Sequence, residues 1–236
     1  MGDKSRYDGG VTAGTDWGVI VARLGEAMGA PAIADVTRDA LARWLTLLAK
    51  WKDKTDLTGA KTPEAMVEVM VADAFVLAAM APRGAVLIDV GAGAGGPAIP
   101  LALLRADVKV TMVEPRVRRV AFLRTSIGAL ALVDRVAAAG ASIDAARPTA
   151  PPDAFAPIDV AFSRATFAPD VWLPIGLALA PRVIVLSTDP LAPSEARVRL
   201  ESERRYRWPF SDAPRWAGSF VRSAEAPQKE SETGVE

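Results

Sequence analysis

Residues 86–101 read VLIDVGAGAGGPAIPL, an apolar run that contains an acid, then a glycine-rich loop, then the start of a helix. Glycines let the backbone turn sharply and approach a ligand without an obstructing Cβ atom. The helix that follows offers unpaired N–H groups to that ligand. This pattern predicts a nucleotide-cofactor loop, and we expect the function of the chain to be decided there.

The spacing of the glycines does not choose between two cofactors. Gly91, Gly93 and Gly96 also match the G-x-G-x-x-G pattern of a dinucleotide site. Asp89 favours S-adenosylmethionine, because its carboxylate can pair with the cationic methionine end and would repel a pyrophosphate. Glu114, at the end of the next predicted strand, is placed to accept hydrogen bonds from ribose hydroxyls, which both cofactors carry. A glycine-rich turn without a ligand is the third interpretation.

The composition limits the chemistry that the chain can perform. It has 236 residues and contains neither cysteine nor histidine, which excludes disulfides, thiolate nucleophiles, zinc–thiolate sites and imidazole bases. We expect no metal site. The formal net charge is zero, so a nucleic acid would have to be bound by a local basic patch.

No apolar stretch of the sequence approaches the length of a membrane span. The first residues are polar and glycine-rich and lack the apolar core of a signal peptide. We therefore expect a cytoplasmic protein without membrane contact, and a monomer.

Three helices are predicted ahead of the glycine loop. The first covers Trp17–Gly29, and Asp35 is predicted to cap the second, in which apolar residues recur at helical spacing. Thr62 and Pro63 mark the start of the third, which continues to Met80. The tryptophans of the second helix share its apolar stripe, so we expect them in the core.

From residue 85 onward, short β-branched runs alternate with helical stretches, which predicts a parallel sheet with crossover helices. The predicted strands are Ala85–Val90, Val108–Glu114, Arg135–Ala139, Ile158–Ser163 and Val183–Ser187. The predicted helices are Pro97–Arg105, Arg116–Ala131 and Asp170–Ala180, and the proline-rich stretch Arg147–Pro157 is predicted to be a surface loop. Two further strands, Arg204–Trp208 and Trp216–Arg222, are predicted to close the sheet in antiparallel orientation.

Four segments carry a resemblance to a known family. Residues 51–58 read WKDKTDLT, residues 89–101 read DVGAGAGGPAIPL, residues 118–123 read RRVAFL, and residues 163–165 read SRA. They are similar to the W-N-x-x-x-N-L-T, D-V-G-x-G-x-G-x-P-G-I-P-L, K-R-x-x-F-L and S-R-A segments of the RsmG (GidB) family, bacterial enzymes that methylate N7 of a guanine in small-subunit ribosomal RNA. The resemblance runs from about Trp44 to Arg222, and its first and last segments distinguish this family from other methyltransferases.

The resemblance implies a fold and an activity. The fold class is α/β, a class I methyltransferase Rossmann-like open sheet that is mostly parallel, with an antiparallel C-terminal hairpin strand and an N-terminal helical extension. The implied activity is S-adenosylmethionine-dependent methyl transfer to N7 of a guanine in 16S ribosomal RNA. The corresponding division of the chain is 1–16 flexible N-terminus, 17–82 helical extension, 83–223 S-adenosylmethionine-binding domain and 224–236 disordered tail.

The resemblance also implies site residues. Together with the residues chosen above, the predicted cofactor-binding set is Asp89, Gly91, Gly93, Gly95, Gly96, Glu114, Ser142, Ile143 and Arg164. Asp89 would hold the methionine end, Glu114 the ribose, and Ser142 with Ile143 the adenine side. Asp73 and Arg164 are the candidate catalytic residues, although by pattern alone each could be a solvated surface charge. At Gly96 the family usually has a larger apolar residue.

Three further residues depart from the family pattern. Ile143 stands where the family has an acid, so Asp144 would have to substitute for it. Met70 replaces a histidine, and Thr188 or Ser187 replaces a lysine. Two alternatives therefore stay open. One is a divergent relative that acts on another substrate or binds RNA or the ribosome without catalysis. The other is a nicotinamide-dependent oxidoreductase, which the lack of a second mononucleotide-binding half disfavours.

Two groups of arginines are candidates for the local basic patch that RNA binding requires. The predicted RNA-binding residues beside Glu114 are Arg116, Arg118, Arg119 and Arg124. A second cluster, in the predicted terminal hairpin, is Arg204, Arg205 and Arg207.

The missing histidine and cysteine also bear on the pH dependence of catalysis. Guanine N7 carries no proton, so its methylation requires no general base. With no catalytic group expected to titrate near neutrality, we predict a single-turnover methyl-transfer rate that is nearly flat from about pH 6.5 to 8.5.

Overall fold

A seven-stranded sheet runs through the computed structural model, which describes residues 14–52, 55–193 and 197–223. The strands are β1 (Val86–Val90), β2 (Lys109–Val113), β3 (Val136–Ala139), β4 (Val160–Arg164), β5 (Arg182–Ser187), β6 (Val198–Arg207) and β7 (Pro214–Arg222). Their order across the sheet is β3-β2-β1-β4-β5-β7-β6. β1 to β5 are parallel, and β7 is antiparallel to both β5 and β6. The predicted mostly parallel sheet with an antiparallel closing hairpin is confirmed.

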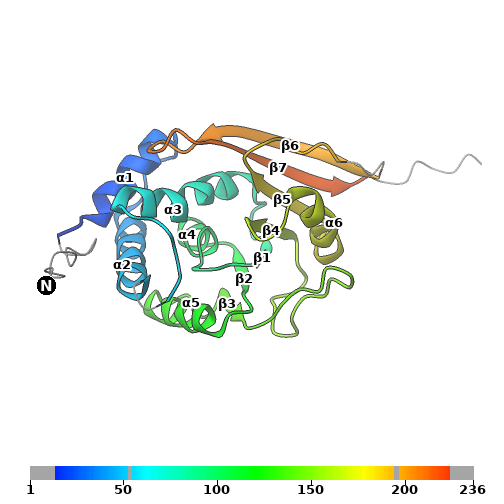
Figure 1. Cartoon of the computed structure of the whole chain (residues 1–236), viewed down its shortest axis with the longest axis horizontal. Coiled ribbons are helices and arrows are strands. Elements are labelled where there is room, and N and C mark those ends of the chain that lie inside the picture. Colours follow the sequence, from blue (N-terminus) through cyan, green and yellow to red (C-terminus); the bar gives the residue numbers. More distant parts are fainter. Residues whose placement is uncertain (1–13, 53–54, 194–196, 224–236) are drawn as a thin grey trace, which may run out of the picture.

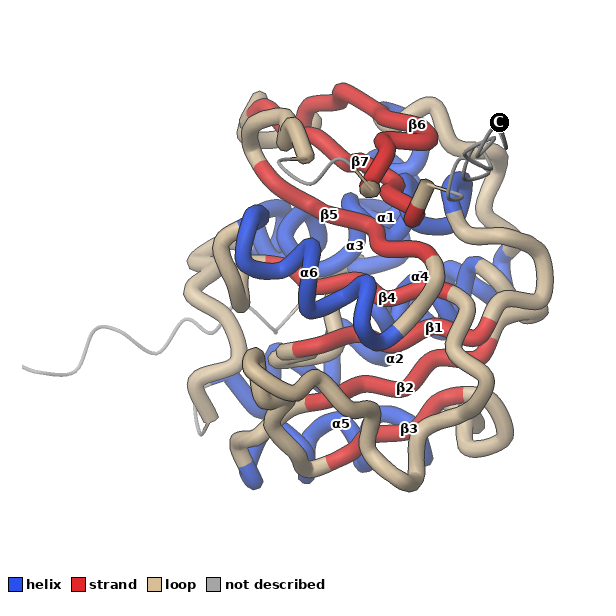
Figure 2. Tube along the Cα trace, turned by 90° about the vertical axis from the view of Figure 1, so that its right-hand side faces the viewer, coloured by secondary structure: helices blue, strands red, loops and turns tan. Residues whose placement is uncertain are grey.

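Helices cover the two faces of the sheet unequally, as Figures 1 and 2 show. On one face lie α1 (Trp17–Ala27), α2 (Asp35–Lys52), α3 (Pro63–Met80), α4 (Ala98–Leu104) and α5 (Val117–Ala129). The opposite face carries α6 (Pro169–Leu179) and the long loop between β3 and β4, whose Ala141, Ile143 and Ala150 pack beside it. β1 and β5 are buried on both sides, which explains their nearly continuous apolar sequences.

The N-terminal helices share one hydrophobic cluster with the sheet. Trp44 is fully buried, and the ring of Trp51 lies 5.6 Å from that of Phe122 on α5. The expectation that these tryptophans belong to the core is confirmed. Because α3 also packs on α4, the helices form a layer of the main fold, and the proposed boundary at residue 82 stays a prediction.

The hairpin of β6 and β7 lies over α1 and α3 (Figure 1). Its turn is fixed to α3, because the buried carboxylate of Glu68 accepts hydrogen bonds from the backbone N–H groups of Phe210 and Ser211. The guanidinium of Arg23 on α1 also lies over the ring of Phe210. The segment that closes the sheet therefore also reaches the N-terminal helices.

Most element boundaries differ from the predictions by one to three residues, and two differences have a clear cause. Asp35 is not the cap of α2 but its first residue, where it pairs with Arg38 at 2.8 Å. β6 begins at Val198, six residues before the predicted strand, and its exposed polar side chains hid this edge strand from a search for apolar runs. Thr62 caps α3 as predicted.

Some expectations concern residues that the structure does not describe. The predicted disordered tail, 224–236, and most of the predicted flexible N-terminus lie outside the described residues. Within the described ranges, no helix combines the length and the apolar character needed to cross a membrane. The expected monomeric state stays a prediction.

Candidate functional site

The glycine loop follows β1 with the backbone geometry that its sequence predicts. Gly91 and Gly93 have φ angles of +80° and +59°, in the left-handed region that favours glycine. A Cβ atom at Gly91 would lie 2.0 Å from Oγ1 of Thr166, so this glycine is required by packing. At Gly93 the nearest atom to such a Cβ, Nη1 of Arg119, is 3.9 Å away. A Cβ atom would thus meet no clash at Gly93, which leaves room for a ligand to approach the backbone.

Asp89 lies in β1 just before this loop and carries an unusual carboxyl group. Its side chain is 1% exposed, and its Oδ2 atom has no hydrogen-bond partner. Burial raises the pKa of Asp89 to about 7; Arg164 opposes this increase and Glu114 adds to it. A buried carboxylate oxygen without a partner is costly unless a ligand supplies the missing interaction. The site is therefore suited to a cationic group.

Glu114, directly after β2, is buried and already has hydrogen bonds. Its Oε2 accepts from the N–H of Gly93 at 2.9 Å, and its Oε1 accepts from the N–H of Arg116 at 2.9 Å. Each carboxylate oxygen can accept more than one hydrogen bond. Glu114 thus shapes the glycine loop and retains the capacity to accept a hydrogen bond from a ligand hydroxyl.

Arg164, the last residue of β4, connects three segments. Its guanidinium donates to the carbonyl oxygen of Val69 on α3, to Oδ2 of Asp73 at 3.2 Å, and to the carbonyl oxygen of Gly96 at 2.8 Å. Its predicted position at the carboxyl end of a strand is correct. The alternative interpretation, a solvated arginine that pairs with a nearby acid, is right about the acid, Asp73, but the side chain is only 19% exposed and joins α3 to the glycine loop.

Asp73 is not a solvated charge on the surface of α3, since it is only 2% exposed. Besides pairing with Arg164, it accepts hydrogen bonds at Oδ1 from Tyr206 Oη at 2.8 Å and from Trp208 Nε1 at 2.9 Å. Burial first and Asp73 second raise the pKa of Tyr206, so its hydroxyl stays protonated as a donor. The sequence analysis missed Tyr206 and Trp208, whose only signal was two aromatic residues at strand spacing.

A cavity of about 270 Å³ adjoins this cluster at the carboxyl ends of β4 and β5. Asp73, Arg164, Tyr206 and Trp208 line it, together with Thr188 after β5 and Arg215 on β7. The guanidinium of Arg215 lies 3.6 Å from the centroid of the Trp208 ring and donates to Thr188 Oγ1 at 3.3 Å. A cation therefore lies beside Thr188, one of the two positions, with Ser187, at which the family resemblance implies a lysine.

Two of the departures from the family pattern lie in contact with each other. A Cβ atom at Gly96 would lie 2.8 Å from both the carbonyl oxygen and the sulfur of Met70. Met70 is 4% exposed, and its backbone lies against the glycine loop. Because Gly96 has no side chain, there is room for Met70 against the backbone of the glycine loop.

The residues predicted on the adenine side follow β3. Ser142 is exposed, and Ile143 is half-buried in the cluster on the α6 face. The carboxylate of Asp144 accepts a hydrogen bond from the N–H of Ala146 at 2.9 Å. Asp144, the possible substitute for the acid that the family has at position 143, is thus engaged in its own loop.

Three of the four arginines predicted to bind RNA on α5 have partners within the protein. Arg119 donates two hydrogen bonds to the carbonyl oxygen of Asp56, and Arg116 lies 3.9 Å from the Asp56 carboxylate. Arg124 donates to the carbonyl oxygen of Ala138 on β3. Arg118 is exposed, and the described residues give it no hydrogen bond or ion pair. Arg119 and Arg124 thus hold α5 in place, whereas Arg118 and Arg116, whose side chain is 64% exposed, remain available to a ligand.

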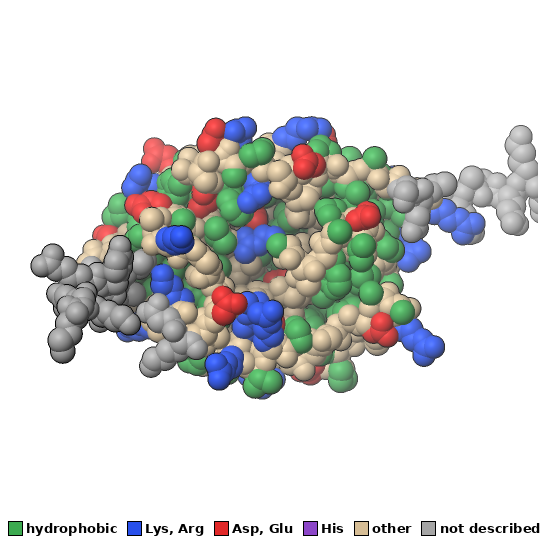
Figure 3. Space-filling view, viewed as in Figure 1, with side chains coloured by type: hydrophobic (Ala, Val, Ile, Leu, Met, Phe, Trp, Pro, Cys, Tyr) green, Lys and Arg blue, Asp and Glu red, His purple; other side chains and the backbone are tan. Residues whose placement is uncertain are grey.

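The site residues gather on one face of the molecule. Figure 3, viewed as Figure 1, shows this face hollowed near its centre, over the ends of β1 and β4, with acidic and basic side chains reaching into the hollow. In the described part of the chain, no three acidic side chains group as metal ligands would.

Comparison with known proteins identifies a family. Residues 37–173 match the family model described as rRNA small subunit methyltransferase G. A protein of that name from Methylobacillus flagellatus is 36% identical over 120 residues, which cover 51% of this chain and 57% of the relative. One from Myxococcus xanthus is 29% identical over 234 residues, covering 93% of this chain and 99% of the relative. The matched part of the chain spans about half the length of several curated relatives.

Solved structures show the same fold at low sequence identity. An O-methyltransferase from Bacillus cereus, solved in complex with SAH, is 14% identical with a TM-score of 0.53, covering 87% of this chain and 98% of that one. This similarity supports the class I methyltransferase fold.

Proposed function

The chain belongs to the rRNA small subunit methyltransferase G family, and we propose that it transfers a methyl group from S-adenosylmethionine to N7 of a guanine in small-subunit (16S) ribosomal RNA. The observation that carries this proposal is the buried, unpartnered Oδ2 of Asp89 beneath an open glycine loop. S-adenosylmethionine has a cationic amino group at its methionine end, whereas a pyrophosphate would meet an anion there.

The residues of the chain suit the parts of this cofactor. Asp89 binds the methionine amino group, Glu114 accepts hydrogen bonds from the ribose, and Ser142 with Ile143 borders the adenine. The open backbone at Gly93 permits close approach. When bound, the cofactor supplies an electrophilic methyl group. The protein contributes orientation, which can account for most of the acceleration when the acceptor has a free lone pair.

Asp73 and Arg164 act in this proposal by positioning rather than by proton transfer. The Asp73 carboxylate accepts hydrogen bonds from three donors, Arg164, Tyr206 and Trp208, which hold it in place. N7 of guanine has no proton to remove, so the proposed transfer requires no base. The cavity that these residues line adjoins the glycine loop through Arg164 and is the proposed site of the acceptor base.

A nicotinamide-dependent oxidoreductase is disfavoured by the topology of the sheet. The usual dinucleotide fold has two parallel mononucleotide-binding halves with strand order 3-2-1-4-5-6. Here β7 is antiparallel and lies between β5 and β6. The second half of a dinucleotide site is therefore missing from the described sheet.

We predict that Gly93→Val weakens cofactor binding at least about tenfold, because the new side chain enters the space left open at this glycine. The matched control is Gly84→Val. Gly84 has a φ of +68° and no atom within 4 Å of the position that a Cβ would occupy, so it bears the same backbone strain away from the loop. Calorimetry with S-adenosylmethionine measures both variants. Equal affinities for the two variants would contradict the assignment of the loop.

We also predict that cells without this protein lose one 7-methylguanosine from small-subunit ribosomal RNA. Nucleoside mass spectrometry of that RNA, with and without the gene, provides the measurement. An unchanged modification profile together with intact S-adenosylmethionine binding would indicate another substrate or a non-catalytic relative. Calorimetric binding of a nicotinamide dinucleotide instead would contradict the methyltransferase assignment itself.

A further inference from the structure

We propose that the RNA strand carrying the acceptor guanine leaves the cavity beside Asp73 along a groove at the projecting end of the β6–β7 hairpin, where Arg215 and Arg205 contact its phosphates. This inference rests on the proposed function and adds the path of the substrate. We call this surface the hairpin groove. Residues 188–190 form one wall, and Arg205, Arg215 and Trp216 form the other.

The hairpin groove continues directly from the proposed acceptor cavity. Both are lined by Thr188, Tyr206 and Arg215, and the groove has a volume of about 360 Å³. β5 ends at Ser187, opposite Trp216, whereas β6 and β7 pair onward to Arg207 and Pro214. The hairpin thus projects beyond its neighbour strand, and the groove opens there.

The charge of the hairpin fits a polyanion. Residues 197–222 contain seven arginines and three acidic residues, although the whole chain has no net charge. This excess makes the hairpin a local positive region of an otherwise balanced protein. Contacts to phosphates account for much of the affinity of proteins for nucleic acids. A protein without net charge can therefore bind RNA through a local positive region of this kind.

Two arginines of the groove retain donors for a ligand. The side chain of Arg205 is 69% exposed, and its ion pair with Glu203 is long, at 3.9 Å. Among the described residues, the guanidinium of Arg215 donates one hydrogen bond, from Nη1 to Thr188, so its other terminal N–H groups are left for a ligand. Arg207 is less available, because it forms a two-point ion pair with Asp212. Asp189 is the single acid among the described residues that line the groove, and it is exposed.

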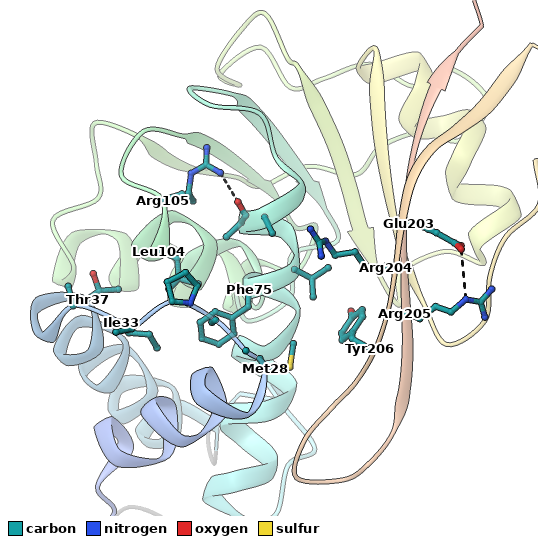
Figure 4. A pocket seen from close by; sticks show the side chains of 18 residues that line it. Met28, Ile33, Thr37, Phe75, Leu104, Arg105, Glu203, Arg204, Arg205 and Tyr206 are labelled. Atoms are coloured by element: carbon teal, nitrogen blue, oxygen red, sulfur yellow. Dashed lines mark hydrogen bonds and ion pairs between the residues drawn. The ribbon is translucent and has the colours of Figure 1, made fainter.

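Neighbouring arginines of β6 point to opposite sides of the hairpin. Figure 4 shows Arg204 and Tyr206 on one side of the strand and Arg205 with Glu203 on the other, and all four border a second cavity of about 870 Å³. Arg204 does not line the hairpin groove. Arg205 and Arg207, the other two members of the second arginine cluster, do line it, and Arg204 is a matched control for Arg205.

The test measures binding to an unmodified transcript of small-subunit ribosomal RNA as a function of salt concentration. Arg205→Glu is expected to weaken binding about tenfold at about 0.1 M salt and to reduce the slope of log K against log salt by about 0.7 or more, the value for one phosphate of a single strand. Arg205→Lys, which keeps the charge, retains binding. Arg204→Glu stays within about twofold of the wild type.

Other outcomes overturn the path. Equal losses in Arg204→Glu and Arg205→Glu would indicate general electrostatic attraction, and a larger loss in Arg118→Glu would direct the RNA over α5. Unchanged calorimetric affinity for S-adenosylmethionine shows that each variant is folded. The proposed function is tested separately, by transfer of labelled methyl groups to the same RNA. If the wild type binds this RNA through Arg205 but transfers no methyl group, the proposed methyltransferase function is contradicted. The proposed path of the RNA along the hairpin groove is not.

Discussion

Arg164→Ala is expected to destabilise the protein by about 3–5 kcal/mol, the usual cost of removing one partner from a buried ion pair. Asp73 is 2% exposed and would keep its charge without the guanidinium that neutralises it. The carbonyl oxygens of Val69 and Gly96 would lose a donor at the same time. Urea denaturation measures the effect, and we expect cofactor affinity to fall with it, because the glycine loop loses its link to α3.

Two further variants isolate the cause. Arg182→Ala removes an arginine that pairs with Glu201 at 2.7 Å near the surface, and it should cost about 1 kcal/mol or less. Adding Asp73→Asn to Arg164→Ala removes the uncompensated charge and should restore part of the lost stability. If the double variant loses as much stability as Arg164→Ala and Asp73→Asn lose together, packing and not charge explains the effect.

The stability of the protein is expected to fall by about 3 kcal/mol between about pH 5 and pH 8 because of Asp89 alone. Its pKa is about 7 in the folded protein, against an ordinary value of 3.8 for an unfolded chain. Between these two pH values the folded state holds a proton on Asp89 and the unfolded state does not. The resulting stability is fully present below the unfolded pKa and is lost as the pH rises through about 7.

The measurement is urea denaturation at several pH values for the wild type and Asp89→Asn. The chain has no histidine, and the pKa values of Asp107 and Asp212 are lowered by Arg105 and Arg207, out of this window. The stability of Asp89→Asn should therefore not decline above about pH 5. Because Arg164 lowers the pKa of Asp89, Arg164→Ala should move the midpoint above about 7. A wild type whose stability is constant over the window would refute the assignment.

Asp89 also changes the expected pH dependence of the reaction. The expectation that no catalytic group titrates near neutrality stays a prediction, but burial raises the pKa of Asp89, a residue proposed to bind the cofactor, to about 7. A bound cationic amino group favours the ionised form, so cofactor affinity should decrease up to about tenfold per pH unit below about 7. The single-turnover rate at saturating cofactor is still expected to be flat, since N7 requires no base.

The sequence contained enough information for the sheet, the glycine loop and the family. Strand and helix patterns have short periods, and the φ angles of Gly91 and Gly93 follow from a local turn, so neighbouring residues are sufficient to predict them. The same locality explains the correct cap at Thr62 and the correct position of Arg164 at the end of β4.

Only the tertiary structure decided what the charged residues do. Arg119 and Arg124, read as an RNA patch, hold backbone carbonyls of distant segments, and Asp73, read as a surface charge, is buried among donors from β4 and the hairpin. These partners are between 14 and 135 residues away in the chain, so no local pattern encodes them. The pKa of Asp89 likewise depends on how completely other segments exclude water from it. Local periodicity determined the framework, and long-range burial determined which charges remain available to a ligand.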